Sequence, residues 1–298
     1  MYDPEQIKDN NTAMVLLSDW YVTKNTSYQT GRSNLTLWLG AAMVFFVAAM
    51  GIVSLFWTPY NPVNYISPHI LQGSTSSHLL GTDQEGRDEL SRLMAGAWIT
   101  VYSGLLATFI GIMAGSSLGI YVAIGRRGVS EAIMRLSDIL LAFPALLLAT
   151  LISVRYGSST LTAVLAIGIA FIPYVTRVTR VNVIKVYKSD YVLTARAYGL
   201  GKMMTVKRHI LPNILPVLTV QTMLLFSVAV LSEAGLSYLG LGTPPPSPAW
   251  GDMLSEAQSV ILTDPLLVLW PTLAIAVTVL GFNLLAEGIL AKTDARNR

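Results

Sequence analysis

Six long apolar segments constrain this chain more than any other feature. They are residues 35–57, 95–124, 136–154, 161–180, 213–234 and 267–290. A helix of about 20 apolar residues crosses the hydrocarbon core of a bilayer. Hydrophobic residues make up 53% of the 298 residues and charged residues only 12%, whereas ordinary soluble domains carry about a quarter charged residues. We therefore expect an all-α, polytopic membrane protein with six transmembrane helices.

The Lys and Arg residues are spread unevenly over the segments between these helices. If the N-terminus is cytoplasmic, 17 of the 20 lie in cytoplasmic segments, and only Arg87, Arg92 and Arg155 lie outside. Cytoplasmic loops of membrane proteins are enriched in Lys and Arg, so we expect both termini in the cytoplasm. The expected order is a cytoplasmic tail 1–34, a first transmembrane helix 35–57, an extracytoplasmic segment 58–94, a transmembrane core 95–290 and a cytoplasmic tail 291–298.

The N-terminal tail lacks the early apolar core of a signal peptide. Its weakly apolar residues 12–22, TAMVLLSDWYV, are either a helix lying on the membrane surface or plain tail. In the second outer segment, 235–266, four prolines favour a stiff extended turn, and SEAQSVILTD (255–264) is expected to form a short helix after it. Among the prolines in or beside the spans, we expect Pro173 and Pro271 to mark helix ends.

Several kinds of chemistry are excluded by the residues present. The chain has no Cys, and His69, His78 and His209 are far apart, so we expect no metal site and no cofactor in this chain. Gly199-Leu-Gly-Lys202 superficially resembles a phosphate loop, but the positions that require Gly and Ser or Thr hold Arg196 and Met203. No catalytic motif is present either, so we expect a protein that is not an enzyme.

Charged residues are also sparse within the spans. Asp138, Glu233 and Glu287 all lie near the expected ends of spans, whereas ion-driven transporters place such groups near the middle of the membrane. Glu233 either faces a central cavity or lies at the outer surface. The segment 95–124 carries Gly111, Gly115 and Gly119 at a four-residue period, a pattern that lets another helix approach closely. That helix belongs either to the same chain or to a partner subunit.

A polar, basic stretch separates the fourth and fifth spans, and it is the best indication of function. Residues 185–213 read KVYKSDYVLTARAYGLGKMMTVKRHILPN. A loop this basic is expected in the cytoplasm. Its pattern predicts two short helices joined at a glycine, lying across the membrane surface and open to a cytosolic partner.

Residues 190–216, DYVLTARAYGLGKMMTVKRHILPNILP, resemble the coupling loop of bacterial ABC importer permeases. That motif runs Glu-Ala-Ala, three residues, Gly, nine residues, a hydrophobe, one residue, Leu-Pro. Flanking residues resemble the dipeptide/oligopeptide/nickel branch of the family, as do the stretches 78–97, 137–149, 232–254 and 270–289. Two positions depart from the motif, because Leu193 stands where it has Glu and Thr194 where it has the first Ala. The resemblance assigns a coupling loop at 185–212 within a permease core, and it identifies these residues as ATPase-coupling: Asp190, Tyr191, Ala195, Arg196, Ala197, Gly199, His209, Leu211 and Pro212.

The resemblance implies a type I ABC importer permease fold in the plasma (inner) membrane of a prokaryote. The implied function is translocation of di- and oligopeptides that an extracytoplasmic solute-binding protein delivers, with 58–94 and 235–266 as its docking surface. The implied partners are a second homologous permease subunit and two cytoplasmic ATPase subunits that bind ATP and Mg, with the lipid bilayer around them and no nucleic acid. One alternative is the same architecture importing nickel or a metal chelate, and another is an ion-coupled secondary transporter.

Overall fold

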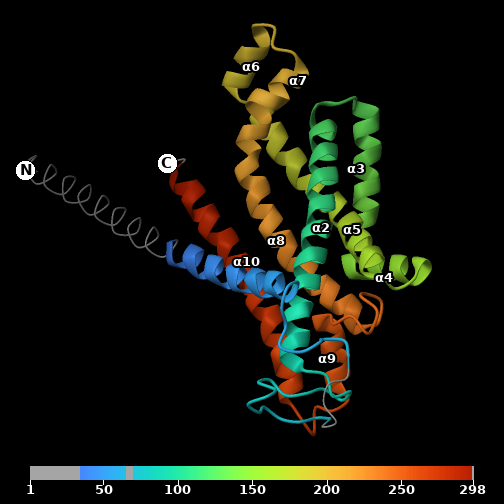
Figure 1. Ribbon diagram of the computed structural model, residues 1–298. Coiled ribbons are helices and arrows are strands. Elements are labelled where there is room, and N and C mark those ends of the chain that lie inside the picture. The colour runs from blue at the N-terminus through green and yellow to red at the C-terminus, as the bar shows by residue number, and fades with distance from the viewer. Residues whose placement is uncertain (1–33, 65–69, 297–298) are drawn as a thin grey trace, which may run out of the picture.

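The computed structural model describes residues 34–64 and 70–296, and in this part of the chain nearly all regular structure is helical (Figure 1). Residues 12–22, whose structure was left open above, lie outside the described residues. The helices are an N-terminal helix Asn34–Ser54, α2 Glu89–Ile124, α3 Arg127–Leu141, α4 Ala145–Tyr156, α5 Thr160–Tyr187, α6 Asp190–Ala197, α7 Lys202–Thr205, a π-helical turn Val206–Ile210, α8 Leu211–Tyr238, α9 Trp250–Gln258 and α10 Leu266–Arg296.

Five helices are long and apolar enough to cross a membrane: the N-terminal helix, α2, α5, the continuous helix Lys202–Tyr238, and α10. The pair α3 and α4 gives a sixth span if the two together count as one. The prediction of an all-α, polytopic membrane protein is therefore confirmed, with five candidate spans or six if the bent pair forms one. The predicted span 136–154 is wrong as a single straight helix, since α3 and α4 meet at an angle of 88°.

Pro144 explains this bend. It precedes α4 directly, it has no N–H to donate, and its ring disfavours helical backbone at Phe143. The expectation that Pro173 and Pro271 mark helix ends is wrong, because Pro173 lies inside α5 and Pro271 inside α10. Within membrane helices, neighbouring side chains and helices compensate for the backbone hydrogen bond that a proline removes.

The most extensive contact among helices α2 to α10 is the crossing of α2 and α5. A Cβ added to Gly111, Gly115 or Gly119 would lie only 2.7, 2.5 or 2.6 Å from the Cβ of Phe171, Val175 or Thr179 in α5. Contact distances below 3.0 Å are not found for real Cβ atoms, so each of these positions needs glycine. The glycine stripe of α2 thus lies against α5 of the same chain and makes the two backbones approach each other.

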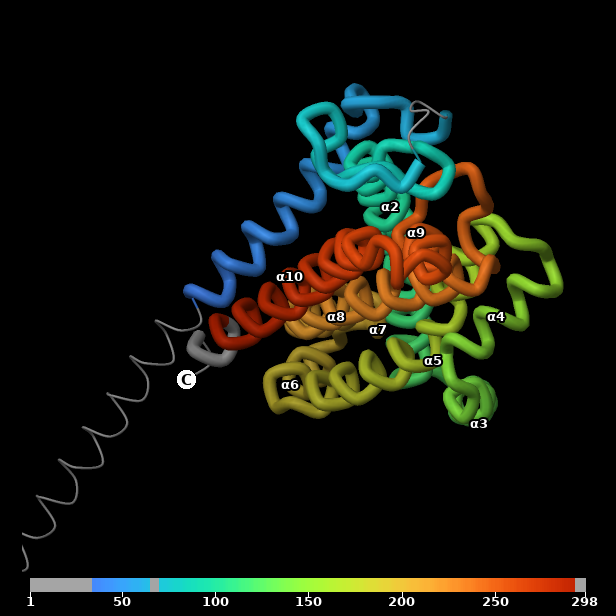
Figure 2. The backbone as a smooth tube through the Cα atoms, turned by 90° about the horizontal axis from the view of Figure 1, so that it is seen from below, coloured from blue at the N-terminus to red at the C-terminus, as the bar shows by residue number. Residues whose placement is uncertain are grey.

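The N-terminal helix packs on α10 in a similar way (Figure 2). A Cβ on Gly40 would lie 2.7 Å from the carbonyl oxygen of Gly281, and one on Gly288 would lie 2.6 Å from the Cβ of Leu37. Small residues therefore mediate both of these close helix pairs, as is common where helices pack within a bilayer.

Two segments far apart in the chain form one end of the molecule: residues 70–88 and the region of α9 (Figure 1). The guanidinium of Arg87 contacts Asp83 at 2.6 Å and Glu256 at 2.9 Å, and Arg92 contacts the same oxygen of Glu256 at 2.8 Å. Trp250 is fully buried and donates its indole N–H to the carbonyl of Leu93 at 3.0 Å. The ion pairs and the indole fasten α9 onto the start of α2.

The position of α9 corrects one expectation. The helix predicted at 255–264 instead runs from Trp250 to Gln258. Its start is set by contacts, because Trp250 is buried against α2 and a Cβ on Gly251 would lie 2.0 Å from the carbonyl oxygen of Ala234. The proline-rich stretch before it, 244–249, is free of helix as expected.

We predict that Gly115→Ala destabilises the protein, because its new methyl group would collide with Val175 across the α2–α5 crossing. Overpacking of this kind costs about 1–3 kcal/mol. Gly235→Ala is the matched control, since its Cβ would meet only Leu146 at an ordinary 3.7 Å and both changes gain the same helix propensity. Thermal unfolding of the purified protein in detergent should show a lower midpoint for Gly115→Ala alone. Equal midpoints for the two variants would contradict the packing described.

Candidate functional site

The coupling segment, residues 185–212, forms the tip of the molecule opposite α9. Figure 1 shows α6 and α7 beyond the ends of α5 and α8. The segment consists of α6, a turn at Gly199, α7 and the π-helical turn that leads into α8. Two short helices joined at a glycine were expected here.

Gly199 ends α6 in a backbone conformation that suits glycine. Its φ is +92°, in the left-handed region where other residues are strained. The carbonyls at the end of α6 are satisfied by the turn, because Tyr198 N–H donates to Thr194 at 3.1 Å and Leu200 N–H donates to Ala195 at 3.2 Å. A glycine that closes a helix with such 6→1 bonding is a known way of ending it. Ala195 therefore contributes its carbonyl to the turn, in addition to its small side chain.

Side chains fasten α6 to the neighbouring helices. The guanidinium of Arg196 lies 4.3 Å from the ring centre of Tyr187, at the end of α5. The ring of Tyr191 lies 6.0 Å from the ring of His209 in the π-helical turn, at an interplanar angle of 60°. Val192, which follows Tyr191 in α6, is fully buried. The two ring contacts connect α6 to the end of α5 and to the π-helical turn that precedes α8.

Beneath the segment lies a small hydrophobic core that joins it to the spans. Its fully buried members come from α5, the π-helical turn and α8, and the end of α2 packs against them: Val183, Ile210, Ile214 and Leu218, with Ile120, Ala123, Ile124, Val186, Tyr187 and Val206 around them. This core joins the π-helical turn, at the end of the coupling segment, to α2, α5 and α8. α6 contributes no residue to it and is connected to the spans through the contacts of Arg196 and Tyr191.

The π-helical turn was not expected from the sequence. Leu211 N–H donates to the carbonyl of Val206, five residues earlier, and π-bulges of this kind are frequent at functional sites. The turn keeps helical continuity from Lys202 to Tyr238, so α7 is the end of a long helix. Leu211 and Pro212 begin α8 directly after the π-helical turn.

The outer face of the segment combines exposed apolar side chains with positive charge. Tyr198 is 89% exposed and Met203 is 70% exposed, and Leu193, at the motif's Glu position, is 46% exposed. Asp190 and Ala197 are exposed as well. The segment also carries exposed basic side chains: Lys185, Lys188, Lys202, Lys207 and Arg208. Apolar groups on a water-facing, charged tip indicate a protein contact. Tyr198 and Met203 were missed as candidates, although both are apolar residues in a loop predicted to lie outside the membrane.

Other candidate residues lie elsewhere. Gly111, Gly115 and Gly119 form the α2–α5 crossing and take no part in the tip. Glu233 is 1% exposed and accepts a hydrogen bond from the Ser237 hydroxyl at 2.8 Å. Of the two positions left open for Glu233, exposure at the surface does not agree with this burial. Its partner Ser237 also accepts a hydrogen bond from the N–H of Thr243 at 3.3 Å. Among the described residues, no group of three or more His, Asp or Glu side chains is arranged to hold a metal ion.

Comparison with known proteins agrees with this arrangement. Residues 96–298 match the family described as binding-protein-dependent transport system inner membrane component. The chain is 34% identical over 254 residues to the glutathione transport system permease protein GsiD of Pectobacterium atrosepticum, covering 85% of this chain and 84% of the relative. It is 37% identical over 226 residues to the dipeptide transport system permease protein DppC of Alkalihalophilus pseudofirmus, covering 76% and 74%.

Among solved structures, the fold is similar to that of a chain in the MetNI methionine ABC transporter in an inward-facing conformation. The TM-score is 0.55 at 16% identity, and the match covers 69% of this chain and 95% of the other. Because identity is this low, the likeness concerns the fold. The sequence relatives and the matched family together show that this chain belongs to the inner membrane components of binding-protein-dependent transport systems: it is a multi-pass, non-catalytic permease subunit of an ABC importer of the bacterial inner membrane, with ATP bound by a partner ATPase.

Proposed function

We propose that this permease imports di- and oligopeptides, glutathione among them, and that its coupling segment is the surface that the ATPase subunits grip. In this proposal a second homologous permease completes the translocation path, and two ATPase subunits bind at the tip. The observation that carries it is the tip itself, where exposed Tyr198 and Met203 sit on an element tied by a hydrophobic core to three spans.

The proposal includes an orientation. The basic tip, both chain termini and the turn between α2 and α3 lie in the cytoplasm, as the Lys and Arg bias requires. The residues 1–34 and 291–298 are then cytoplasmic, although α10 continues to Arg296. The segment 58–94 and the region of α9 are extracytoplasmic.

The mechanical role of the coupling segment follows from its attachments. When the ATPase subunits close on ATP, they displace α6 and α7. The cation–π contact of Arg196 with Tyr187 passes this displacement to α5, and the continuous helix Lys202–Tyr238 passes it along α8. The spans then alternate between inward- and outward-open states, and each ligand acts through its different affinity for the two states.

The extracytoplasmic end offers a preformed surface to the solute-binding protein. The cluster of Asp83, Arg87, Arg92 and Glu256 holds residues 70–88 and α9 as one unit. Burial and the nearby charge of Glu256 raise the pKa of Asp252 in α9 to about 6. A rigid unit of this kind pre-organises a docking surface and lowers the entropic cost of binding.

The peptide assignment is supported by what the relatives' names state about those proteins, dipeptide and glutathione transport. Import of nickel or a metal chelate by the same architecture is the alternative, in which the binding protein and not this chain would recognise the metal.

We predict that Gly199→Val uncouples ATP hydrolysis from transport. A β-branched residue at φ +92° is strained. Because nothing lies within 4 Å of the new Cβ, the substitution changes the backbone of the turn after α6 and causes no steric clash. Gly201→Val is the matched control, because its surroundings are equally open and its φ is −66°. With the transporter in proteoliposomes, the solute imported per ATP hydrolysed should fall severalfold in the Gly199 variant alone. An unchanged ratio in both variants would refute the lever role.

We also predict ATP-dependent uptake of labelled dipeptide or glutathione when the reconstituted transporter is supplied with its cognate binding protein. Uptake should require hydrolysable ATP and should persist when proton and sodium gradients are collapsed. Uptake of a nickel chelate but of no peptide would favour the alternative substrate. Uptake driven by an ion gradient without ATP would contradict the ABC importer mechanism.

A further inference from the structure

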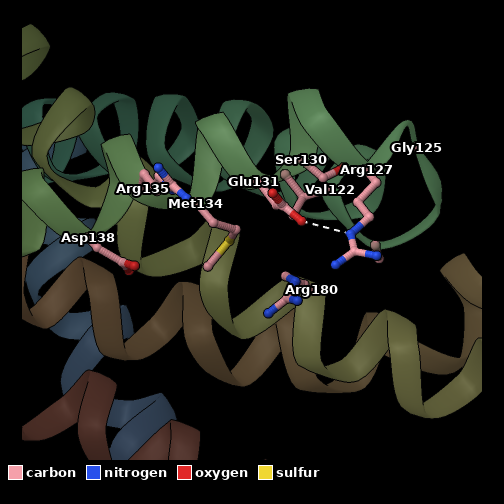
Figure 3. A pocket seen from close by; sticks show the side chains of 10 residues that line it. Val122, Gly125, Arg127, Ser130, Glu131, Met134, Arg135, Asp138 and Arg180 are labelled. Carbon is pink, nitrogen blue, oxygen red and sulfur yellow. Dashed lines mark hydrogen bonds and ion pairs between the residues drawn. The ribbon is translucent and has the colours of Figure 1, made fainter.

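A basic cavity lies at the coupling end of the molecule, between the end of α2, the polar side of α3 and α5 (Figure 3). Its volume is about 560 Å³, within the range of small-ligand sites. Figure 3 shows Arg180 of α5 across the cavity from Arg127 and Glu131 of α3. The lining is Val122, Ala123, Gly125, Arg127, Ser130, Glu131, Met134, Arg135, Asp138 and Arg180.

The charges around this cavity do not balance. The carboxylate of Glu131 is paired with Arg127 at 2.8 Å, and that of Asp138 is paired with Arg177. In the described part of the chain, Arg135 and Arg180 make no ion pair, so two guanidinium groups remain without a counter-charge. The arrangement therefore favours an anion.

Two hydrogen-bond donors in the cavity wall also lack partners. Arg180 Nε and Ser130 Oγ are both buried, and neither has a hydrogen-bond partner among the described residues. Buried donors of this kind are costly unless a ligand or water satisfies them. They belong to different helices, α5 and α3, which both line the cavity.

The outer side of α3 indicates where the anion comes from. Polar residues recur every three or four positions on the side of α3 that lines the cavity. Other positions of the helix carry exposed apolar side chains, Val129, Leu136 and Ile139, between 47% and 59% exposed. A helix that turns apolar groups outward and charged groups toward a cavity suits the boundary between lipid tails and headgroups.

We propose that this cavity binds the phosphate headgroup of an anionic phospholipid from the cytoplasmic leaflet. Arg180 and Arg135 supply the positive charge, because guanidinium groups match phosphate oxygens in a forked geometry, and the Ser130 hydroxyl donates a further hydrogen bond. Val129 and Leu136 contact the acyl chains. Basic pockets between transmembrane helices on the cytoplasmic side bind acidic headgroups in this manner. The inference rests on the orientation proposed above, and it does not depend on the transported solute.

The test is native mass spectrometry of the complete purified transporter, exchanged into detergent with equal amounts of phosphatidylglycerol and phosphatidylcholine. The wild type should retain phosphatidylglycerol selectively. Arg180→Gln should reduce this retention by roughly tenfold, the effect of losing one strong interaction with a charged group, and Arg180→Lys should recover part of it. Arg126→Gln is the matched control, because Arg126 is an exposed arginine at the start of α3 that does not line the cavity. Basal ATP hydrolysis, measured on every variant, shows that each complex is assembled.

Equal phosphatidylglycerol retention in Arg180→Gln and Arg126→Gln would overturn the proposal. If Arg180→Gln fails to assemble, Arg135→Gln and Ser130→Ala on the α3 side of the cavity test the same prediction, a loss of phosphatidylglycerol retention. Displacement of the lipid by millimolar inorganic phosphate would show a site for soluble phosphate and overturn the lipid assignment. Loss of the ATPase subunits from Arg180→Gln with lipid retention intact would show that the cavity receives a protein carboxylate, which also overturns it. Failure of peptide uptake would leave this result unaffected.

Discussion

The close approach of α2 and α5 is the constraint on which the rest of the structure depends. Three glycines on α2 let its backbone lie directly on α5, and a methyl group at any of them would push the helices apart. In a bilayer there is no hydrophobic driving force between helices, so association depends on such close packing. The cluster of Ala107, Ala163, Ile167, Phe171 and Val175 is built around this crossing.

The same crossing joins the two functional ends of the molecule. α2 begins in the ion cluster with Arg92, and it ends with Ile124 against the core beneath the coupling segment. α8 is a second connection between the two ends, because it leads from the π-helical turn to the buried Glu233 and Ser237. In the orientation that we propose, movement at the tip would reach the proposed docking surface for the binding protein along these two helices.

Much of this architecture could be predicted from the sequence because it depends on local patterns. Apolar length predicted the spans, and the position of Gly199 predicted the turn of the coupling segment. A proline such as Pro144 can kink a helix, but the size of the bend could not be predicted, because apolar length shows that a segment is buried in the membrane and not which direction it takes. Pro173 was taken for a helix end because the packing that supports α5 is not visible in its own residues.

Other features depend on contacts between distant residues, and these had no local signal. Glu256 lies 169 positions from Arg87, its partner in the ion cluster. The cavity is lined by residues of α2, α3 and α5 and therefore needs all three helices in place. The π-helical turn places Ile210 in one cluster with Val183 of α5 and Ile214 of α8.

The central claim is that the tip formed by α6 and α7 receives the ATPase, and site-directed cross-linking tests it most directly. The chain has no native cysteine, so Tyr198→Cys gives a single reactive thiol at an 89% exposed position. Leu262→Cys, fully exposed in the segment between α9 and α10, is the control. With a thiol-specific photo-cross-linker in the assembled transporter, we predict a covalent product between the permease and the ATPase subunit for Tyr198→Cys alone. No such product from an active Tyr198→Cys complex, or equal products from both positions, would contradict the account.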